Sequence, residues 1–172
     1  MNKEICSLCG GLFILEVGEV GDSCHVTRND GGHIRIVVKR QGVRSLSDLR
    51  RKELMALGEA MRLASGALKY ALTENGVPIG RVNCQINGNW SDLYGTDSAF
   101  CVHIYGRARN AKKQPFGQAL NFPSPRENPD FYDGNEPLTD KDIALICEYV
   151  KENSHLSLFS RLISRFISWL LR

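Results

Sequence analysis

Small or reactive side chains occupy the first three alternate positions of the segment AFCVHIYGR, residues 99–107: Ala99, Cys101 and His103. Because the side chains of a β-strand alternate between its two faces, these three are expected to project from the same face of one strand. A thiolate is a nucleophile, and an imidazole beside it can take up or release a proton near neutral pH. The spacing therefore makes Cys101 and His103 the candidate catalytic pair of this chain.

The segment resembles the signature of the histidine-triad (HIT) family of nucleotide hydrolases and transferases, in which three histidines alternate with apolar residues on the last strand of an antiparallel sheet. Further stretches are similar to the same family: GGHIRIVVKR to its glycine-histidine strand, RVNCQINGN to the strand and turn before the triad, and GRARNAKKQPFGQALNFP with FYDGNEPLTDKDI to one bacterial branch. The likeness covers about residues 5–152 and leaves out the last twenty.

The triad is degenerate in this chain. Counted back from IYGR, His103 takes the place of the third histidine, Cys101 of the second and Ala99 of the first. In the family the second histidine attacks the α-phosphate of a nucleotide and forms a nucleotidyl-histidine. An unperturbed cysteine, with a pKa of about 8.5, is mostly protonated at neutral pH and cannot copy that step directly. We therefore predict a HIT-like nucleotide-binding protein in which nucleotide hydrolase or transferase activity is lost or much reduced.

Two alternatives stay open. In the first, the chain is an active nucleotide phosphohydrolase or nucleotidyl transferase that acts at an α-phosphate with Cys101 or His103 in place of the usual nucleophile; a neighbouring His103 would then lower the pKa of the thiol. In the second, the domain is an interaction or membrane-associated scaffold that acts through its C-terminal helix. A cysteine and an alanine on a half-buried strand are also common core residues, which favours loss of the reaction.

The resemblance implies a set of nucleotide-binding residues. Asn87 corresponds to the asparagine that faces the ribose and phosphate, His33 to a histidine that lines the pocket, and His103 faces the phosphates together with the hydroxyl groups of Thr96 and Ser98. Glycine- and serine-rich backbone such as residues 95–98 can also turn N–H groups toward an anion. The implied ligand is a purine nucleotide. Taken alone, the NGN sequence is equally typical of a turn, and one histidine at a strand start is more often structural.

A cysteine pair near the N-terminus has the spacing of half a zinc site. Two residues separate Cys6 from Cys9, which lets both sulfurs meet one tetrahedral ion. The family completes such a site with two histidines, and both positions lack one here. Cys24 and His25 are candidate substitutes, although adjacent residues of a strand point to opposite faces. No cofactor is therefore predicted other than a candidate zinc ion at Cys6 and Cys9.

The composition is that of an ordinary globular domain. Hydrophobic residues make up 42% and charged residues 24% of the 172 residues, which argues against disorder and against an integral membrane protein. A net charge of +3 is too small to predict a nucleic-acid partner. The N-terminal sequence MNKEICSLCGGLFILEV lacks the pattern of a secretory signal, so a cytoplasmic location with reduced cysteines is expected.

The order of the expected elements indicates an α+β fold. Strand-like segments are LFILEV (12–17), CHVT (24–27), HIRIVVK (33–39), RVNCQI (81–86) and AFCVHIYG (99–106). One long helix is expected over 47–75, capped by Ser45 or Ser47, and a shorter one from the cap Thr139 to about 153. Because the strands lie before and after one long helix rather than alternating with helices, we predict an antiparallel sheet of about five strands.

The expected domain organisation is a HIT-like domain over residues 1–153 and a C-terminal amphipathic helix over 154–172. The resemblance also implies a homodimer in which two domains extend one sheet across their interface.

The last segment, residues 156–172, is expected to form an amphipathic helix. Its large apolar residues follow helical spacing, with serines and arginines between them: Leu158, Phe159, Leu162, Ile163, Phe166, Ile167, Leu170 and Leu171. It is too short and too charged to span a bilayer, but apolar residues opposite arginines suit a helix on a membrane surface. The alternatives are a protein partner, the second protomer or its own domain. The predicted location is therefore cytoplasmic, with a peripheral membrane association as the further expectation.

Serine substitution of Phe159, Leu162, Phe166 and Leu170 should abolish binding to anionic vesicles, because attachment depends mainly on apolar burial. Glutamine at Arg161, Arg165 and Arg172 should only weaken binding and remove most of its salt dependence. Vesicle co-sedimentation at two salt concentrations measures both effects. A chain that ignores vesicles, and that becomes unstable or monomeric when truncated at Ser154, would assign the helix to the domain or the dimer instead.

Overall fold

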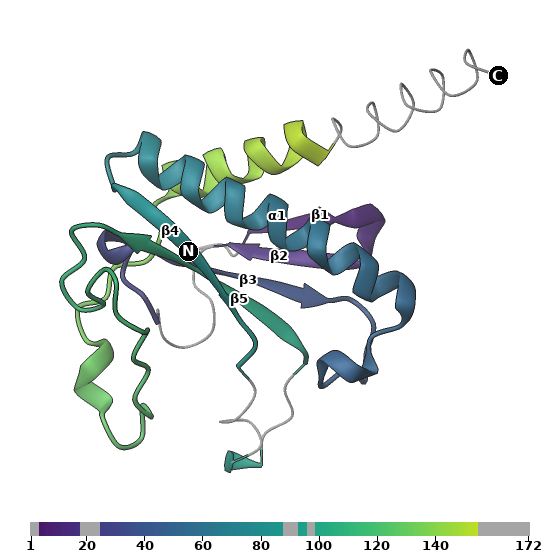
Figure 1. Ribbon diagram of the computed structural model, residues 1–172, viewed down its shortest axis with the longest axis horizontal. Coiled ribbons are helices and arrows are strands. Elements are labelled where there is room, and N and C mark those ends of the chain that lie inside the picture. The colour runs from purple at the N-terminus through teal and green to yellow at the C-terminus, as the bar shows by residue number, and fades with distance from the viewer. Residues whose placement is uncertain (1–3, 18–24, 88–92, 96–98, 155–172) are drawn as a thin grey trace.

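Five antiparallel strands form one sheet in the computed structural model (Figure 1). The structure describes residues 4–17, 25–87, 93–95 and 99–154, without the side chains of residues 4–7 and 129. The strands are β1 (Glu4–Leu8), β2 (Phe13–Val17), β3 (His33–Val38), β4 (Ile79–Gln85) and β5 (Cys101–Ala108). They lie in the order β1-β2-β3-β5-β4, and every neighbouring pair is antiparallel. The predicted α+β class with about five antiparallel strands is confirmed.

One predicted strand is wrong and one was missed. The described part of the segment 24–27 forms a bend that leads into the short 3-10 helix η2 (Arg28–Asp30). Its backbone groups serve a turn instead, because the carbonyl of Thr27 accepts hydrogen bonds from the N–H groups of Asp30 and Gly32. The strand that the prediction missed is β1, whose cysteine-containing sequence EICSL shows no clear polar–apolar alternation. It pairs with β2 from Glu4 opposite Val17 to Leu8 opposite Phe13.

The long helix α1 covers Arg51–Glu74, a few residues later than predicted at its N-terminus. Ser45 belongs to the separate 3-10 turn η3 (Leu46–Asp48), so neither predicted serine caps α1. At the start of α1, Glu53 accepts a hydrogen bond of 2.8 Å from the backbone N–H of Arg50. The chain leaves the helix at Asn75 and turns at Gly76, where φ is +85°.

The second helix begins where the sequence predicts, and its described part covers residues 140–154. Thr139 caps it reciprocally with Asp142: the threonine hydroxyl accepts from the backbone N–H of Asp142 at 3.2 Å, and the carboxylate accepts from the backbone N–H of Thr139 at 2.9 Å. The buried Asp142 also accepts from Arg28 at 2.6 Å and from Asn75 at 2.7 Å. This ion pair fixes the turn before β3 to both helices.

The helices and the sheet form two layers. Figure 1 shows α1 and the helix of residues 140–154 side by side over one face of the sheet, and Tyr70 of α1 lies 5.5 Å from Tyr149, centroid to centroid. Buried alanines of α1 let the helix approach alternate residues of the central strands β3 and β5. The buried core residues of these three elements are Leu57, Ala60, Leu63, Ala64, Ala67, Leu68, Ala71, Leu72, Ile34, Ile36, Val102 and Ile104. The intervening residues of β3 and β5 therefore project from the opposite face.

Two glycines let the start of β3 approach β5. A Cβ atom at Gly106 of β5 would overlap the backbone carbonyl of Gly31, and the backbone N–H of Gly106 donates to the carbonyl of Gly32 at 3.2 Å. Gly31 has a φ of +136°, which side chains of L-residues rarely tolerate. This contact places His33 directly opposite Tyr105 in the register of β3 and β5.

No helix among the described ranges is long and apolar enough to cross a membrane. The segment 156–172, on which the membrane-surface prediction rests, lies outside the described residues.

The Gly106→Ala variant should lower the free energy of unfolding by at least about 2 kcal/mol, because the added methyl group meets backbone that cannot move aside cheaply. Urea denaturation measures the change. Gly58→Ala is the matched control: Gly58 lies within α1 with nothing within 4 Å of a Cβ, so alanine there should stabilise by about 0.5–1 kcal/mol. Equal effects at the two positions would contradict a close contact between β3 and β5.

Candidate functional site

The predicted reactive pair lies on the sheet face opposite α1. Cys101 is the first residue of β5 and is half-buried, and His103 is 6% exposed. Ala99 precedes the strand and is exposed, so it does not continue the row as predicted. The two side chains that could do chemistry therefore share a face, while the alanine in the place of the first histidine lies outside the strand.

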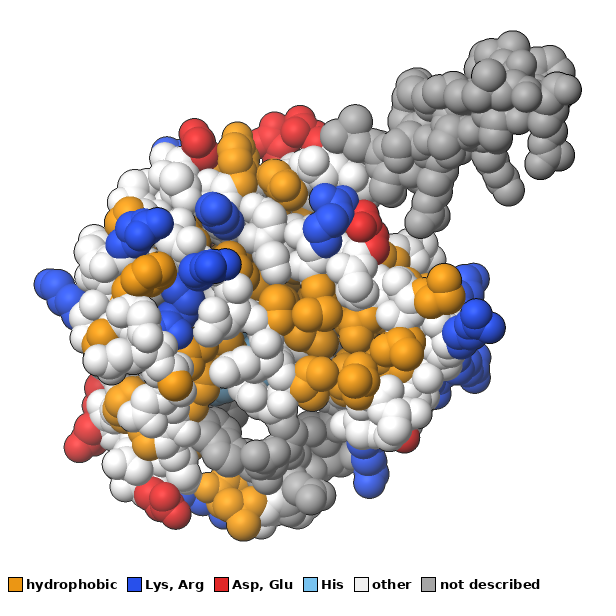
Figure 2. Space-filling model, viewed as in Figure 1, with side chains coloured by type: hydrophobic (Ala, Val, Ile, Leu, Met, Phe, Trp, Pro, Cys, Tyr) orange, Lys and Arg blue, Asp and Glu red, His pale blue; other side chains and the backbone are white. Residues whose placement is uncertain are grey.

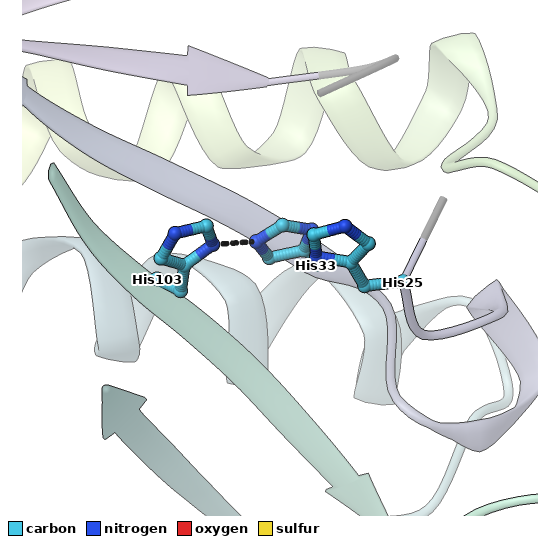
Figure 3. A group of neighbouring side chains, drawn as sticks. All are labelled: His25, His33 and His103. Atoms are coloured by element: carbon cyan, nitrogen blue, oxygen red, sulfur yellow. Dashed lines mark hydrogen bonds between the residues drawn. The ribbon is translucent and has the colours of Figure 1, made fainter. Parts of the chain in front are cut away.

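A hydrogen-bonded row joins three of the predicted site residues. The Sγ atom of Cys101 lies 3.3 Å from Nε2 of His103. Figure 3 shows the next contact of the row, in which Nδ1 of His103 lies 2.9 Å from Nε2 of His33. The imidazole rings of His33 and His103 are nearly parallel, at 13°, with centroids 5.1 Å apart. His103 is thus held by β3 through one nitrogen and meets the thiol through the other.

His25 joins this group, which the sequence did not predict. Its ring centroid lies 5.2 Å from that of His33 and 6.0 Å from that of His103. Figure 3 shows it next to His33, on the segment that leads into η2. The glycine turn between the two residues folds the chain back, which places His25 beside a residue eight positions later. The sequence did offer a signal, because the two histidines flank the turn NDGG, residues 29–32.

Burial keeps the three imidazoles uncharged at neutral pH. Desolvation, and then the charges of His25 and Arg35, lower the pKa of His103 to about 4. Desolvation also holds the pKa of the fully buried His33 well below its ordinary value, and it lowers the pKa of His25. Burial likewise raises the pKa of the Cys101 thiol, and the charge of Arg35 offsets this only in part. The ground state of the row is therefore a thiol beside neutral rings.

Arg35 is a second residue that the prediction missed. It lies on β3 directly opposite His103 on β5, and opposite Glu16 on β2. Its guanidinium group forms an ion pair with Glu16 and donates from Nε at 2.7 Å. The alternation of HIRIVV could have found it, because residues two apart on a strand share a face and His33 was already placed on the site. A cation thus lies on the same face as the histidines.

Asn87 is connected to the same group through Tyr105. Its side-chain amide donates to the Tyr105 hydroxyl at 3.3 Å, and the Tyr105 ring lies 4.5 Å from that of His33, centroid to centroid. The predicted Thr96 and Ser98 lie outside the described residues, and the backbone at Gly95 is exposed. The structure therefore brings His33, Asn87 and His103 together around one tyrosine.

The loop of residues 109–137 closes the far side of the histidines. Phe122 lies 5.8 Å from His25 and 4.9 Å from Tyr105, ring centroid to ring centroid, and Tyr132 lies 5.8 Å from His25. Two buried charged residues hold this loop. Asp30 accepts the backbone N–H groups of residues 112, 113 and 114 at 2.7–2.9 Å, and Arg107 donates to the carbonyl groups of residues 114, 115 and 118.

Of the predicted zinc pair, the described Cys9 does not lie at this site. The side chain of Cys6 lies outside the described residues, and the thiol of Cys9 donates to the carbonyl of Ala56 in α1 at 3.4 Å. Cys9 thus packs on the helix side of the sheet, whereas His25, the proposed substitute ligand, lies with the histidines on the other side. His25 therefore does not fit as the third ligand of a site at Cys6 and Cys9.

Comparison with known proteins supports the fold alone. No family model and no curated protein matches the sequence. Among solved structures, a histidine triad (HIT) protein from Sinorhizobium meliloti 1021 is similar with a TM-score of 0.54 and 16% identity over 86% of both chains. A histidine triad protein from Bradyrhizobium japonicum is similar with a TM-score of 0.52 and 13% identity over 86% of this chain and 89% of the other. The fold expected from the resemblance is confirmed.

Proposed function

We propose that this chain, on its histidine-triad fold, binds the phosphate end of a purine nucleotide and does not carry out the nucleotidyl transfer of the family it resembles. The observation that carries the proposal is the row from Cys101 through His103 to His33. In this row a thiol takes the place of the attacking imidazole, while His103 is hydrogen-bonded to the buried His33. Binding groups are retained in this arrangement, and the nucleophile is not.

The face that carries this row suits an anion. Arg35, which is paired with Glu16, places guanidinium N–H donors opposite His103, and guanidinium groups form charge-assisted hydrogen bonds with phosphate. The side-chain amide of Asn87 has two N–H donors, of which one bonds the Tyr105 hydroxyl, and the other can donate to the ligand. These contacts fit the binding residues that the resemblance implies, with Arg35 added to them.

Loss of the transfer reaction follows from the state of the thiol. Attack on phosphorus requires a thiolate, and burial disfavours the charged form of Cys101. His103 would have to accept the proton, but the same burial disfavours an imidazolium there. A thiolate–imidazolium pair is therefore costly at this place, which favours a binding protein over the alternative of an active enzyme that uses Cys101 or His103.

A homodimer remains the predicted assembly. β4 is an outer strand of the sheet, which suits the sheet-extending interface that the resemblance implies. Ile86, just after β4, is 51% exposed, and Figure 2 shows hydrophobic side chains gathered on one face of the molecule. The division into a domain of residues 1–153 and a helix of residues 154–172, with a membrane or protein partner for the latter, likewise stays a prediction.

Titration with AMP in the presence of EDTA tests the binding site. Arg35→Gln combined with Glu16→Gln should weaken binding at least about tenfold, because a charge-assisted hydrogen bond contributes about 1.5–3 kcal/mol and the double change leaves no carboxylate unpaired. Arg62→Gln with Glu59→Gln is the matched control, since this ion pair lies on α1, on the other side of the sheet. No AMP binding by the unaltered chain, or equal loss in both variants, would overturn the site.

Hydrolysis of an adenosine phosphoramidate tests the loss of catalysis. The Ala99→His, Cys101→His variant should exceed the unaltered chain by at least about 100-fold, because a neutral imidazole is nucleophilic at pH 7 and a buried thiol is not. Cys101→Ser should leave the low basal rate unchanged. A fast unaltered chain that Cys101→Ser inactivates would instead establish a thiolate mechanism.

A further inference from the structure

Three histidines that lie far apart in the sequence present ring nitrogens to one another. One nitrogen from each of His25, His33 and His103 lies within 4.8 Å of the other two (Figure 3). We propose that these residues, called here the three-histidine cluster, bind a divalent transition metal ion of the Zn²⁺ type. This site goes beyond nucleotide binding and depends on no nucleotide.

The chemistry of the donors selects the class of ion. Imidazole nitrogen suits Zn²⁺, Cu²⁺, Ni²⁺ and Co²⁺, whereas Mg²⁺ and Ca²⁺ prefer oxygen. Three histidines with a fourth position left open are a common ligand set of zinc sites. The chain thus offers a complete protein ligand set without either cysteine of the N-terminal pair.

The distances need only small adjustments. A tetrahedral ion about 2.0–2.1 Å from each nitrogen holds its ligands about 3.3–3.4 Å apart. The hydrogen-bonded nitrogens of His33 and His103 lie 2.9 Å apart, slightly closer than that, and the cluster as a whole lies within 4.8 Å. His33 and His103 are fixed on β3 and β5, whereas His25 lies in an irregular segment, so the adjustment falls mainly to its ring.

A buried nitrogen without a partner is the second observation. Nε2 of His33 contacts His103, and Nδ1 of His33 is buried with no hydrogen-bond partner among the described residues. When Nε2 of His33 donates to His103, this Nδ1 keeps a bare lone pair; when Nε2 accepts, Nδ1 carries a buried N–H. Either arrangement costs free energy, since buried polar atoms are normally satisfied. An ion bound at Nδ1 removes this cost, whereas an ion bound at Nε2 leaves Nδ1 with the buried N–H.

The surroundings favour ligation by neutral rings. Tyr105, Phe122 and Tyr132 lie against the cluster with centroid distances of 4.5–5.8 Å, which limits competition from water. The positive charge of Arg35 opposes a cation, but its ion pair with Glu16 offsets that charge locally. A dry site next to a compensated charge is compatible with a divalent ion.

Titration of the full chain with Co²⁺, without nucleotide, tests the site. The unaltered chain should bind one equivalent and show visible d–d bands of a tetrahedral complex without the near-ultraviolet band of a cobalt–thiolate bond. His25→Gln and His33→Gln should each weaken binding at least tenfold. His155→Gln is the matched control, because it changes the remaining histidine, which follows the described part of the chain, and it should bind like the unaltered protein.

The Cys6→Ser, Cys9→Ser variant separates this site from the predicted thiolate site. It should retain the visible bands in full. The proposal is overturned when the bands disappear in this variant, when they survive His25→Gln and His33→Gln unchanged, or when the unaltered chain forms no one-to-one complex at micromolar concentration.

A measurement on the unaltered chain covers the case in which a histidine variant fails to fold. Addition of Zn²⁺ should shift the imidazole nitrogen resonances of His25, His33 and His103 in NMR spectra and leave those of His155 in place. Shifts confined to His155, or none at all, overturn the site. Since the AMP titration is done in EDTA and the metal titration without nucleotide, failure of either proposal leaves the result for the other readable.

Discussion

The hydrogen bond between His33 and His103 is the contact on which the site depends. Each ring lies on a different strand, and each is almost completely removed from water, so the two can coexist only as neutral groups that share one proton. The close passage of Gly31 past Gly106 sets the register that makes the contact, and the ion pair of Arg28 with Asp142 holds the turn from which β3 starts. Contacts at the start of β3 thus determine that His33 meets His103 on the sheet.

The replacement of an imidazole by a thiol has different effects on binding and on chemistry. A neutral imidazole is reactive without losing a proton, whereas a thiol must first ionise, and a low-dielectric site makes that step more costly. Hydrogen bonds and ion pairs between matched groups are strengthened by the same low-dielectric environment. A thiol at position 101 is therefore compatible with the proposed function, in which the nucleotide is bound and the transfer reaction is absent.

The sequence predicted the layers of the fold better than the composition of the site. Alternation and helix caps located β2, β3, β4, β5 and the cap Thr139, because these signals are local. The segment 24–27 looked like a strand only because backbone hydrogen bonds to a turn are invisible in a residue pattern. His33 and His103 were found through the resemblance to a known signature. His25 and Arg35 were missed, because their roles arise from a fold-back and from cross-strand register, which link residues without any shared local pattern.

The loop over the histidines is held in a way that bears on how its sequence can vary. Asp30 and Arg107 are buried charges of opposite sign, and both bind backbone groups of residues 112–118 rather than their side chains. Every residue type except proline at the donating positions supplies the same N–H and carbonyl groups. The identity of Lys112 is thus free to drift at these contacts, whereas the number of residues between it and β5 is not. Lys113 differs, because its ammonium group also donates to the carbonyl groups of Phe131 and Asp133 at 3.2 and 2.7 Å. Insertion or deletion is what the backbone contacts with Asp30 and Arg107 cannot tolerate.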